Sequence, residues 1–273
     1  VKNYIVNVDK DSVLANMSLP ASDSSKIVDK LSWNVGKGAL SKGDLIVLDI
    51  ISQNAKEGWR RPIYWTTTAG PSAYLNLNPY LRNNGLTYQL VPVLADQSRR
   101  GMDDLDLLYD RFMNVYEWGN MDKGTMFLDE KAQIVPQNLR ASFVQLAEYL
   151  FKKGKVDSAV SLVDKCYSAM PESLVPMNLR LKASTADIYY KAGQIEKGDK
   201  ILTEVGDDVY ELFAYFRKIE GNKEKSINEY TLDNRQQENL GILRNVGLMA
   251  KNYKRDELAK KYTDLFEQAS KGY

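Results

Sequence analysis

Residues 140–171 constrain the fold more than any other stretch of this sequence. Apolar residues recur there at spacings of three and four, which places them on one face of a helix. Gly154 interrupts the pattern, a second apolar face follows, and Pro171 ends it because proline cannot continue a helix. The stretch therefore predicts two antiparallel helices joined at Gly154. The apolar positions are Phe143, Leu146, Ala147 and Leu150 in the first helix and Ala159, Leu162, Val163 and Cys166 in the second.

The order of large and small apolar residues in this pair fits a tetratricopeptide repeat of about 34 residues. A second repeat is predicted around Gly193, after a longer loop at 173–178, and a degenerate last pair at 240–269. A separate helix is expected between them at 209–219. Terminal repeats often drift because one of their faces meets water. We therefore predict a short right-handed stack of helical pairs over residues 134–273.

The region before the stack, residues 1–133, contains runs of β-branched and aromatic residues that favour strands. An edge strand is expected at 4–8, and one more short strand at 125–128. The run at 63–67 follows a proline at a position that is tolerated at a strand start, and we expect it to be the central strand. A second strand is expected at 86–94.

Helices are predicted between these strands. Residues 27–31 predict a short helix, and residues 45–55 a longer one that is buried on most sides. Ser41 and Asp44 form a capping-box pattern at the start of the longer helix. A helix packed on strands predicts a small layered α+β or α/β domain, which we place at residues 1–133.

Charge and apolar patterning exclude several functional classes. The chain of 273 residues has a net charge of +1, and residues 1–135 carry 15 basic against 16 acidic residues, so neither half is basic. A nucleic-acid partner is therefore not expected. The longest apolar run, at 45–51, is much shorter than the roughly 20 apolar residues of a membrane-spanning helix. We expect no transmembrane segment within this chain.

The residue types that most often carry catalysis are scarce. The sequence has no histidine, which is the commonest general base and a frequent metal ligand. Its one cysteine, Cys166, lies on the apolar face of the second helix, where we expect it to fill the core rather than act as a nucleophile. The segment Gly36-Lys37-Gly38 lacks the spacing of a phosphate-binding loop.

Two Asp-x-Asp patterns, Asp9-Lys10-Asp11 and Asp104-Leu105-Asp106, resemble those that hold a divalent ion in nucleotide-sugar transferases. Side chains two apart on a helix point away from each other, so these carboxylates are not expected to converge on one ion. Asp103 and Asp104 are instead expected to cap a helix at 105–116, where acidic residues suit the positive end of the helix. We predict no catalytic, metal-binding or cofactor-binding residue in this chain.

The segment around Trp59 holds the polar and aromatic residues that the predicted fold explains least. Arginine beside aromatic rings can bind a carboxylate, a phosphate or a sugar. The alternative is structural, with Trp59 and Tyr64 in the core and Arg61 paired with Asp49 or Asp44. The inner groove of the helical stack is a further candidate, for a peptide, although short stacks also serve as spacers. The candidate ligand- or partner-binding residues are Trp59, Arg60, Arg61, Tyr64, Tyr80 and Tyr88.

A series of short motifs follows in a fixed order between about residues 28 and 204. They are Leu48-Asp49-Ile50-Ile51 with Asn54, Trp59-Arg60-Arg61-Pro62-Ile63-Tyr64, Tyr80, Gly85-Leu86-Thr87-Tyr88-Gln89-Leu90-Val91-Pro92, Trp118-Gly119-Asn120, and Asn138-Leu139-Arg140. This series resembles the C-terminal soluble region of a family of bacterial multi-spanning membrane proteins. The N-terminal part of those proteins, a domain of unknown function, resembles protein O-mannosyltransferases of the glycosyltransferase-C type.

The resemblance implies that this chain is the tail of a larger protein and faces the periplasm, attached through an upstream multi-spanning region. In such transferases the catalytic acid lies in the membrane part and the sugar donor is lipid-linked, so the tail is expected to be non-catalytic. Its expected partner is the acceptor protein or the membrane part of the same chain. A rival hypothesis is a carbohydrate-binding or hydrolytic domain that uses Trp59, Arg61 and Tyr64. A third is an independent scaffold without a membrane parent.

Overall fold

The computed structural model describes residues 3–94, 104–220 and 229–270. The chain divides into two compact units, Val1–Glu117 and Trp118–Tyr273. The described strands lie in the first unit, and the described part of the second unit is helical, so the predicted order of a small sheet-containing region and a helical region is confirmed. The division at residue 133 stays a prediction.

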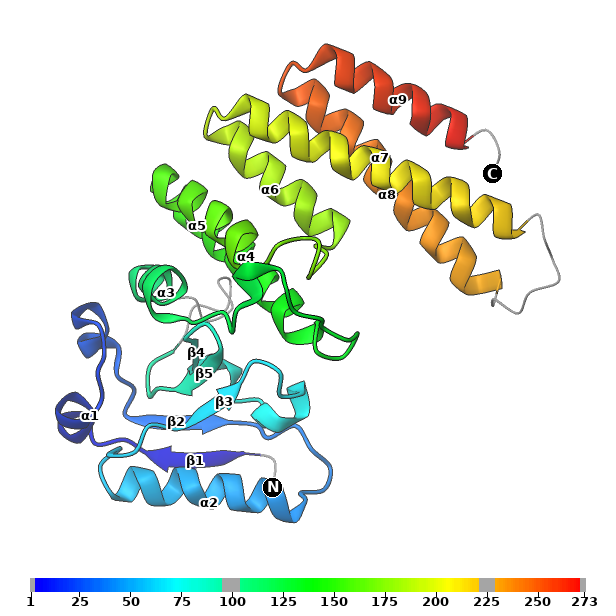
Figure 1. Ribbon diagram of the computed structural model, residues 1–273. Helices are drawn as coiled ribbons and strands as arrows, with labels where there is room; N and C mark the ends of the chain where they lie inside the picture. Colours follow the sequence, from blue (N-terminus) through cyan, green and yellow to red (C-terminus); the bar gives the residue numbers. More distant parts are fainter. Residues whose placement is uncertain (1–2, 95–103, 221–228, 271–273) are drawn as a thin grey trace. The chain divides into compact units, whose positions relative to one another are not determined.

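Two small antiparallel sheets form the first unit (Figure 1). Strands β1 (Tyr4–Asn7) and β2 (Lys30–Trp33) pair in one sheet, with Val6 opposite Leu31. The other sheet has the order β3-β5-β4, formed by β3 (Tyr64–Thr66), β4 (Leu81–Asn83) and β5 (Thr87–Leu90). The strands predicted at 4–8, 63–67 and 86–94 are therefore present in shortened form.

Three details of the predicted strands and helices are wrong. Strand β3 lies at an edge of its sheet, because β5 occupies the centre. The helix predicted at 27–31 is absent: Ala21–Lys26 forms a 3₁₀ helix, and β2 follows because Leu31 and Trp33 are buried while Ser32 between them is exposed. This alternation has the period of a strand. Residues 125–128 form no strand.

Helix α2 (Lys42–Lys56) begins as predicted. The Ser41 hydroxyl accepts from the backbone N–H of Asp44, and the Asp44 carboxylate accepts from that of Ser41, which completes the capping box. The expectation that this helix is buried on most sides is wrong, because only Leu48, Ile51 and Asn54 are buried. The exposed apolar side chains are Leu45, Ile46 and Ile50, at 53%, 59% and 50%.

The turn between β4 and β5 is held by the segment that follows helix α3 (Leu105–Asp110). The Tyr116 hydroxyl donates to the carbonyl of Asn84 at 2.7 Å, and the guanidinium of Arg111 donates to the same carbonyl at 3.0 Å. Gly85 has φ +95°, and a Cβ there would lie 2.2 Å from the Tyr116 oxygen, so the turn requires glycine. The predicted helix at 105–116 thus consists of α3 and a π-helical turn.

The second unit opens with the predicted helical hairpin. Helices α4 (Ile134–Lys152) and α5 (Val156–Ala169) pack together, and Gly154 lies between them with φ +77°. The predicted pair and its apolar faces are confirmed, since the eight apolar positions that predicted it are all at most 1% exposed.

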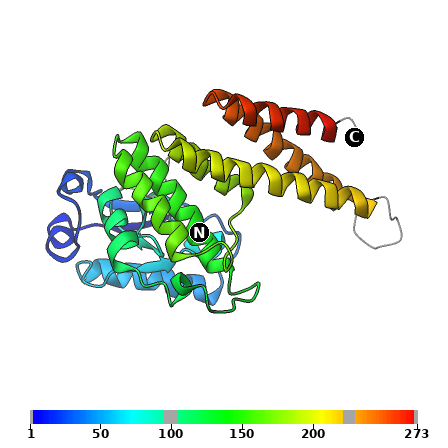
Figure 2. The same cartoon turned by 45° about the horizontal axis from the view of Figure 1, so that its top comes forward.

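Two further helical pairs follow (Figures 1 and 2). Helix α6 (Leu179–Lys191) packs on α7 (Ile195–Glu220), and α8 (Glu229–Asn252) packs on both α7 and α9 (Asp256–Ser270). The separate helix predicted at 209–219 is wrong, because α7 continues through that region as one helix.

Glycines on α7 make room for aromatic rings of its neighbours. A Cβ at Gly206 would lie 2.2 Å from the ring of Tyr262 on α9, and one at Gly198 would lie 2.7 Å from the ring of Tyr190 on α6. The Tyr262 ring is fully buried, and its hydroxyl donates to the carbonyl of Thr203 at 3.0 Å. These close approaches fix the register between α7 and the helices packed on it.

A buried arginine stabilises the loop between α5 and α6. Arg140 is completely buried, and its guanidinium donates to the backbone carbonyls of Met170 and, at 2.6 Å, of Val175. It also lies over the ring of Tyr167, with 5.9 Å to the ring centroid. This loop is longer than a tetratricopeptide repeat usually has, and the buried guanidinium of Arg140 holds it in place.

Candidate functional site

Trp59 and the two arginines that follow it, which were predicted to share a binding site, differ in exposure. Trp59 is 1% exposed and belongs to the core, as the structural alternative expected. Arg60 and Arg61 are exposed. The side chain of Asn54 bonds both the N–H and the carbonyl of Arg61, at 3.1 and 2.8 Å, and so holds the backbone of this segment.

The three tyrosines of the predicted site do not share one surface. Tyr64 and Trp65 are neighbours on β3, and Trp65 is the cross-strand partner of Tyr88, so Tyr64 and Tyr88 point to opposite faces of the sheet. Tyr64 is 47% exposed and does not fill the core. Tyr80 is buried, and its hydroxyl donates to the Ser32 carbonyl at 3.3 Å. The binding role of these residues stays a prediction.

Asp44, one of the two carboxylates proposed to pair with Arg61, bonds other residues. Asp44 receives a hydrogen bond from the ammonium of Lys37 at 2.6 Å and closes the capping box with Ser41. The hydrogen bond from Lys37 and the backbone hydrogen bond from Ser41 hold the pKa of Asp44 down, at about 2. This carboxylate therefore stabilises the start of α2.

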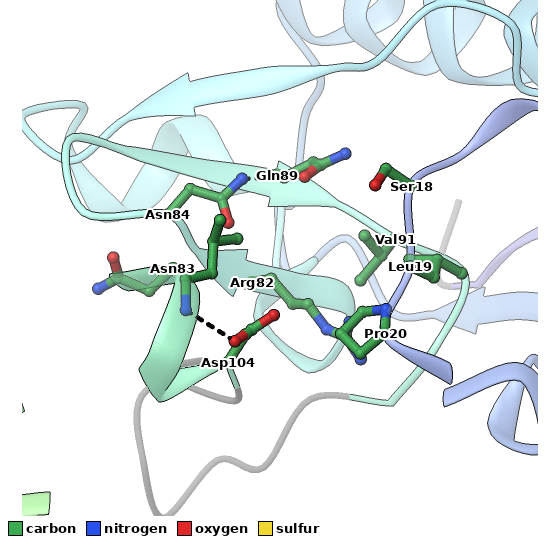
Figure 3. A pocket seen from close by; sticks show the side chains of 10 residues that line it. Ser18, Leu19, Pro20, Arg82, Asn83, Asn84, Gln89, Val91 and Asp104 are labelled. Atoms are coloured by element: carbon green, nitrogen blue, oxygen red, sulfur yellow. Dashed lines mark hydrogen bonds between the residues drawn. The ribbon is translucent and has the colours of Figure 1, made fainter. Parts of the chain in front are cut away.

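A polar pocket of about 220 Å³ lies beside β4 and β5 in the first unit (Figure 3). Arg82 comes from β4, Asn84 from the turn, Gln89 from β5, and Asp104 from the residue before α3. Arg82 and Gln89 are cross-strand partners, so the register of the hairpin places them on the same side. The polar side chains that line the pocket are Ser18, Arg82, Asn83, Asn84, Gln89 and Asp104.

Internal contacts fix the polar wall of this pocket. Arg82 forms an ion pair with Asp23, and both side chains are only 8% exposed. The Asn84 amide nitrogen donates to the Gln89 amide oxygen at 2.9 Å, and Figure 3 shows Gln89 between Asn84 and Ser18. One oxygen of Asp104 accepts from the N–H of Leu107 at 2.9 Å, which confirms its predicted capping role; Asp103 lies outside the described residues.

A larger groove of about 360 Å³ lies on the helical unit, between α5 and α7. Two tyrosines, from α5 and α6, and Ile201 from α7 give it apolar surface. Its rim is charged. The residues that line it include Asp164, Tyr167, Tyr189, Lys197, Lys200 and Ile201.

Ion pairs organise the rim and the floor of this helical groove. Lys197 bonds Asp164 at 2.8 Å, and the Tyr189 hydroxyl donates to the same carboxylate. Burial and this carboxylate raise the pKa of Tyr189. Beneath them, the nearly buried ammonium of Lys182 lies 2.6 Å from Glu172 and 2.8 Å from Glu204. Lys200 is exposed at the rim.

Cys166 and Asp9, two groups that could carry chemistry, have structural roles. Cys166 is completely buried, and desolvation raises the pKa of its thiol to about 12, so the predicted core role is confirmed. Asp9 caps helix α1 (Lys10–Asn16) by accepting from the N–H of Asp11 and the hydroxyl of Ser12. Within the described ranges, no three His, Cys, Asp or Glu side chains are placed to hold a metal ion.

The described helices lack the features of membrane-spanning segments. None of them combines the length and the apolar character that crossing a membrane requires.

Sequence reasoning missed both the polar pocket and the charges of the helical groove. Residues 82–84 are consecutive, polar and buried. A half-buried strand is recognised in sequence by alternating apolar and polar residues, so this run did not indicate a buried strand. A lysine in a helix is normally expected at the surface. Lys182 is buried because the fold places two carboxylates, those of Glu172 and Glu204, beside it. The polar run Arg82-Asn83-Asn84, directly followed by Gly85, is the sequence feature that could have indicated the pocket.

Comparison with known families gives one finding. Residues 1–108 match the family model described as TMEM260-associated domain 2. The match includes both small sheets and the residues of the polar pocket. No curated protein and no solved structure matches the chain significantly.

Proposed function

We propose that this chain is a non-catalytic accessory domain of a membrane glycosyltransferase-like protein and that it binds the protein to be modified. The observation that carries the proposal is the match of residues 1–108 to a domain associated with TMEM260, which ties the chain to a membrane protein resembling protein O-mannosyltransferases. The motifs Trp118-Gly119-Asn120 and Asn138-Leu139-Arg140, which lie outside the matched residues, support the same assignment.

The finer parts of the proposal follow from the resemblance. The parent is a bacterial protein of the glycosyltransferase-C type, and the chain lies at the periplasmic face of the membrane. The helical unit is a stack of tetratricopeptide-like repeats. The hairpin turn at Gly154, the similar turn at Gly193 and the small residues between the helices support this repeat assignment.

The helical groove is the proposed docking surface. Its tyrosines and Ile201 offer contact area, and tyrosine is enriched where proteins bind proteins. Charged side chains on the rim, such as Lys197 and Lys200, suit a polypeptide in water better than the apolar interior of a membrane. Of the two predicted partners, the acceptor protein therefore fits this groove better than the membrane part of the same chain.

Sugar transfer by the whole membrane protein, measured against acceptor concentration, tests this function. Lys200→Glu reverses one rim charge at an exposed position without breaking an ion pair of the groove. An exposed charge contact contributes about 0.2–1 kcal/mol, so we expect the KM for an acidic acceptor segment to rise roughly two- to fivefold while kcat is unchanged.

The matched control is Lys260→Glu, which makes the same charge change on α9, at another exposed position. We expect it to leave KM unchanged. The proposal fails if both variants behave like the unmodified protein, or if Lys200→Glu lowers kcat alone. The reading frame upstream of Val1 gives a second check, because it must encode several apolar segments of roughly 20 residues.

A further inference from the structure

The polar pocket beside β4 and β5 has hydrogen-bonding groups that the fold leaves unused. The Asn84–Gln89 contact uses the nitrogen of one amide and the oxygen of the other. The Asn84 oxygen and the Gln89 nitrogen therefore remain for a ligand, an acceptor and a donor on neighbouring side chains. In the described part of the chain neither atom has another hydrogen-bond partner.

Two more groups extend this set. The hydroxyl of Ser18 can donate and accept, and the second oxygen of Asp104 can accept, since the first is bound to the N–H of Leu107. The pocket thus presents donors and acceptors together. A hydroxyl group is itself a donor and an acceptor, so several adjacent hydroxyls match such a set better than an acceptor-only or donor-only ligand does.

Charge narrows the ligand class. Among the lining residues that the structure describes, the one cation is Arg82, and it is paired with the buried carboxylate of Asp23. Asp104 then leaves a negative charge at the pocket, which repels phosphates and carboxylates. The geometry therefore favours a neutral ligand.

The size of the pocket and its apolar surface narrow the ligand class further. A volume of about 220 Å³ lies below the roughly 300–1,000 Å³ of pockets for drug-sized ligands, so the pocket suits a single small ring. Leu19 and Val91 line the same space and can pack against C–H groups. A hydroxyl-rich ring with apolar C–H faces is the chemistry of a monosaccharide unit.

We infer that the pocket lined by Ser18, Asn84, Gln89 and Asp104 binds one neutral sugar residue. This site is distinct from the helical groove and from the predicted residues around Trp59. Its ligand is either a free monosaccharide or one sugar of a larger glycan, which share the same hydroxyl chemistry. The inference does not depend on the docking role of the helical unit, because all of its residues lie within the first unit.

Saturation-transfer NMR on the whole chain tests the site with a defined panel. The probes are free glucose, galactose, mannose and N-acetylglucosamine, their methyl glycosides, and glucose 6-phosphate. We expect at least one neutral probe to bind and glucose 6-phosphate to bind more weakly than glucose. Binding of free sugars alone indicates a monosaccharide ligand, whereas equal or better binding of the glycosides indicates a sugar within a glycan.

Gln89→Glu removes the free amide nitrogen and keeps the oxygen that holds Asn84. Losing this donor is expected to weaken sugar binding about tenfold. Gln53→Glu is the control, because it makes the same change at an exposed position on α2. Ser18→Ala is a second test at an exposed residue outside any helix or strand, should Gln89→Glu not fold.

The inference is overturned if no neutral probe binds, if glucose 6-phosphate binds best, or if Gln89→Glu and Ser18→Ala bind sugar as the unmodified chain does. None of these results bears on the groove test with Lys200→Glu. The two proposals can therefore fail separately.

Discussion

One buried residue of the helical unit, Cys166, makes the stability of the fold depend on pH in the alkaline range. Cys166 is surrounded by apolar side chains and by Arg140, and desolvation raises the pKa of its thiol from 9.0 to about 12. The folded protein therefore keeps this proton where the unfolded chain has lost it. The resulting stabilisation is complete below pH 9 and is lost as the pH rises toward 12.

Replacing the thiol is expected to flatten this alkaline loss of stability. Cys166→Ala removes one titrating group, so the free energy of unfolding should fall less steeply between pH 9 and 12, by up to roughly 1.4 kcal/mol per pH unit. Urea unfolding at several alkaline pH values measures the slope. The buried tyrosines titrate in both proteins, and because Cys166 is only a minor cause of the raised pKa of Tyr167 and Tyr189, most of their contribution cancels in the comparison. Equal slopes would show that the thiol does not ionise on unfolding.

The roles of several single residues were open to sequence reasoning, and others were not. Cys166, Asp104 and the Ser41–Asp44 capping box were predicted from periodicity and spacing alone, because these are local patterns. The buried charge of Lys182 depends on carboxylates from α7 and from the loop before α6. Such distant pairings leave no trace in a short window of sequence.

At the scale of helices and strands, long periodic segments were predictable and short ones were not. The α4–α5 hairpin has two full apolar faces and a glycine turn, so its period was unambiguous. The four-residue strand β2 offers only two alternations, and its residues fit a helix nearly as well. Helix α7 was divided in the prediction between a second repeat and a separate helix at 209–219, whereas it is continuous and its glycines face aromatic rings of neighbouring helices.

A pair of glycine substitutions tests that explanation of α7. Gly206→Ala places a Cβ against the fully buried ring of Tyr262, and overpacking is expected to destabilise the protein by roughly 1–3 kcal/mol. Gly241→Ala, on α8, meets no atom within 4 Å and should instead stabilise by up to about 1 kcal/mol, since alanine favours helices. Thermal or urea unfolding compares the two. Similar effects of both substitutions would mean that Tyr262 does not occupy the space beside Gly206.

The whole molecule joins a family-matched first unit and a helical second unit for which no solved structure gives a match. Sequence reasoning predicted this order because a change from strand to helix periodicity extends over many residues. It did not predict the polar pocket, because this pocket forms only where the β4–β5 hairpin meets the residues that follow α1 and the residue that precedes α3. The predicted cluster around Trp59 included Tyr64 and Tyr88, which the register between β3 and β5 places on opposite faces of the sheet.

In the proposed function, the membrane part of the parent protein catalyses sugar transfer and this chain binds the acceptor protein. Transfer of sugar from a lipid-linked donor to an acceptor protein, measured for the purified chain and for the whole membrane protein, tests it most directly. We predict transfer by the whole protein and none by the purified chain at any pH or donor concentration. Turnover by the purified chain alone would contradict the account.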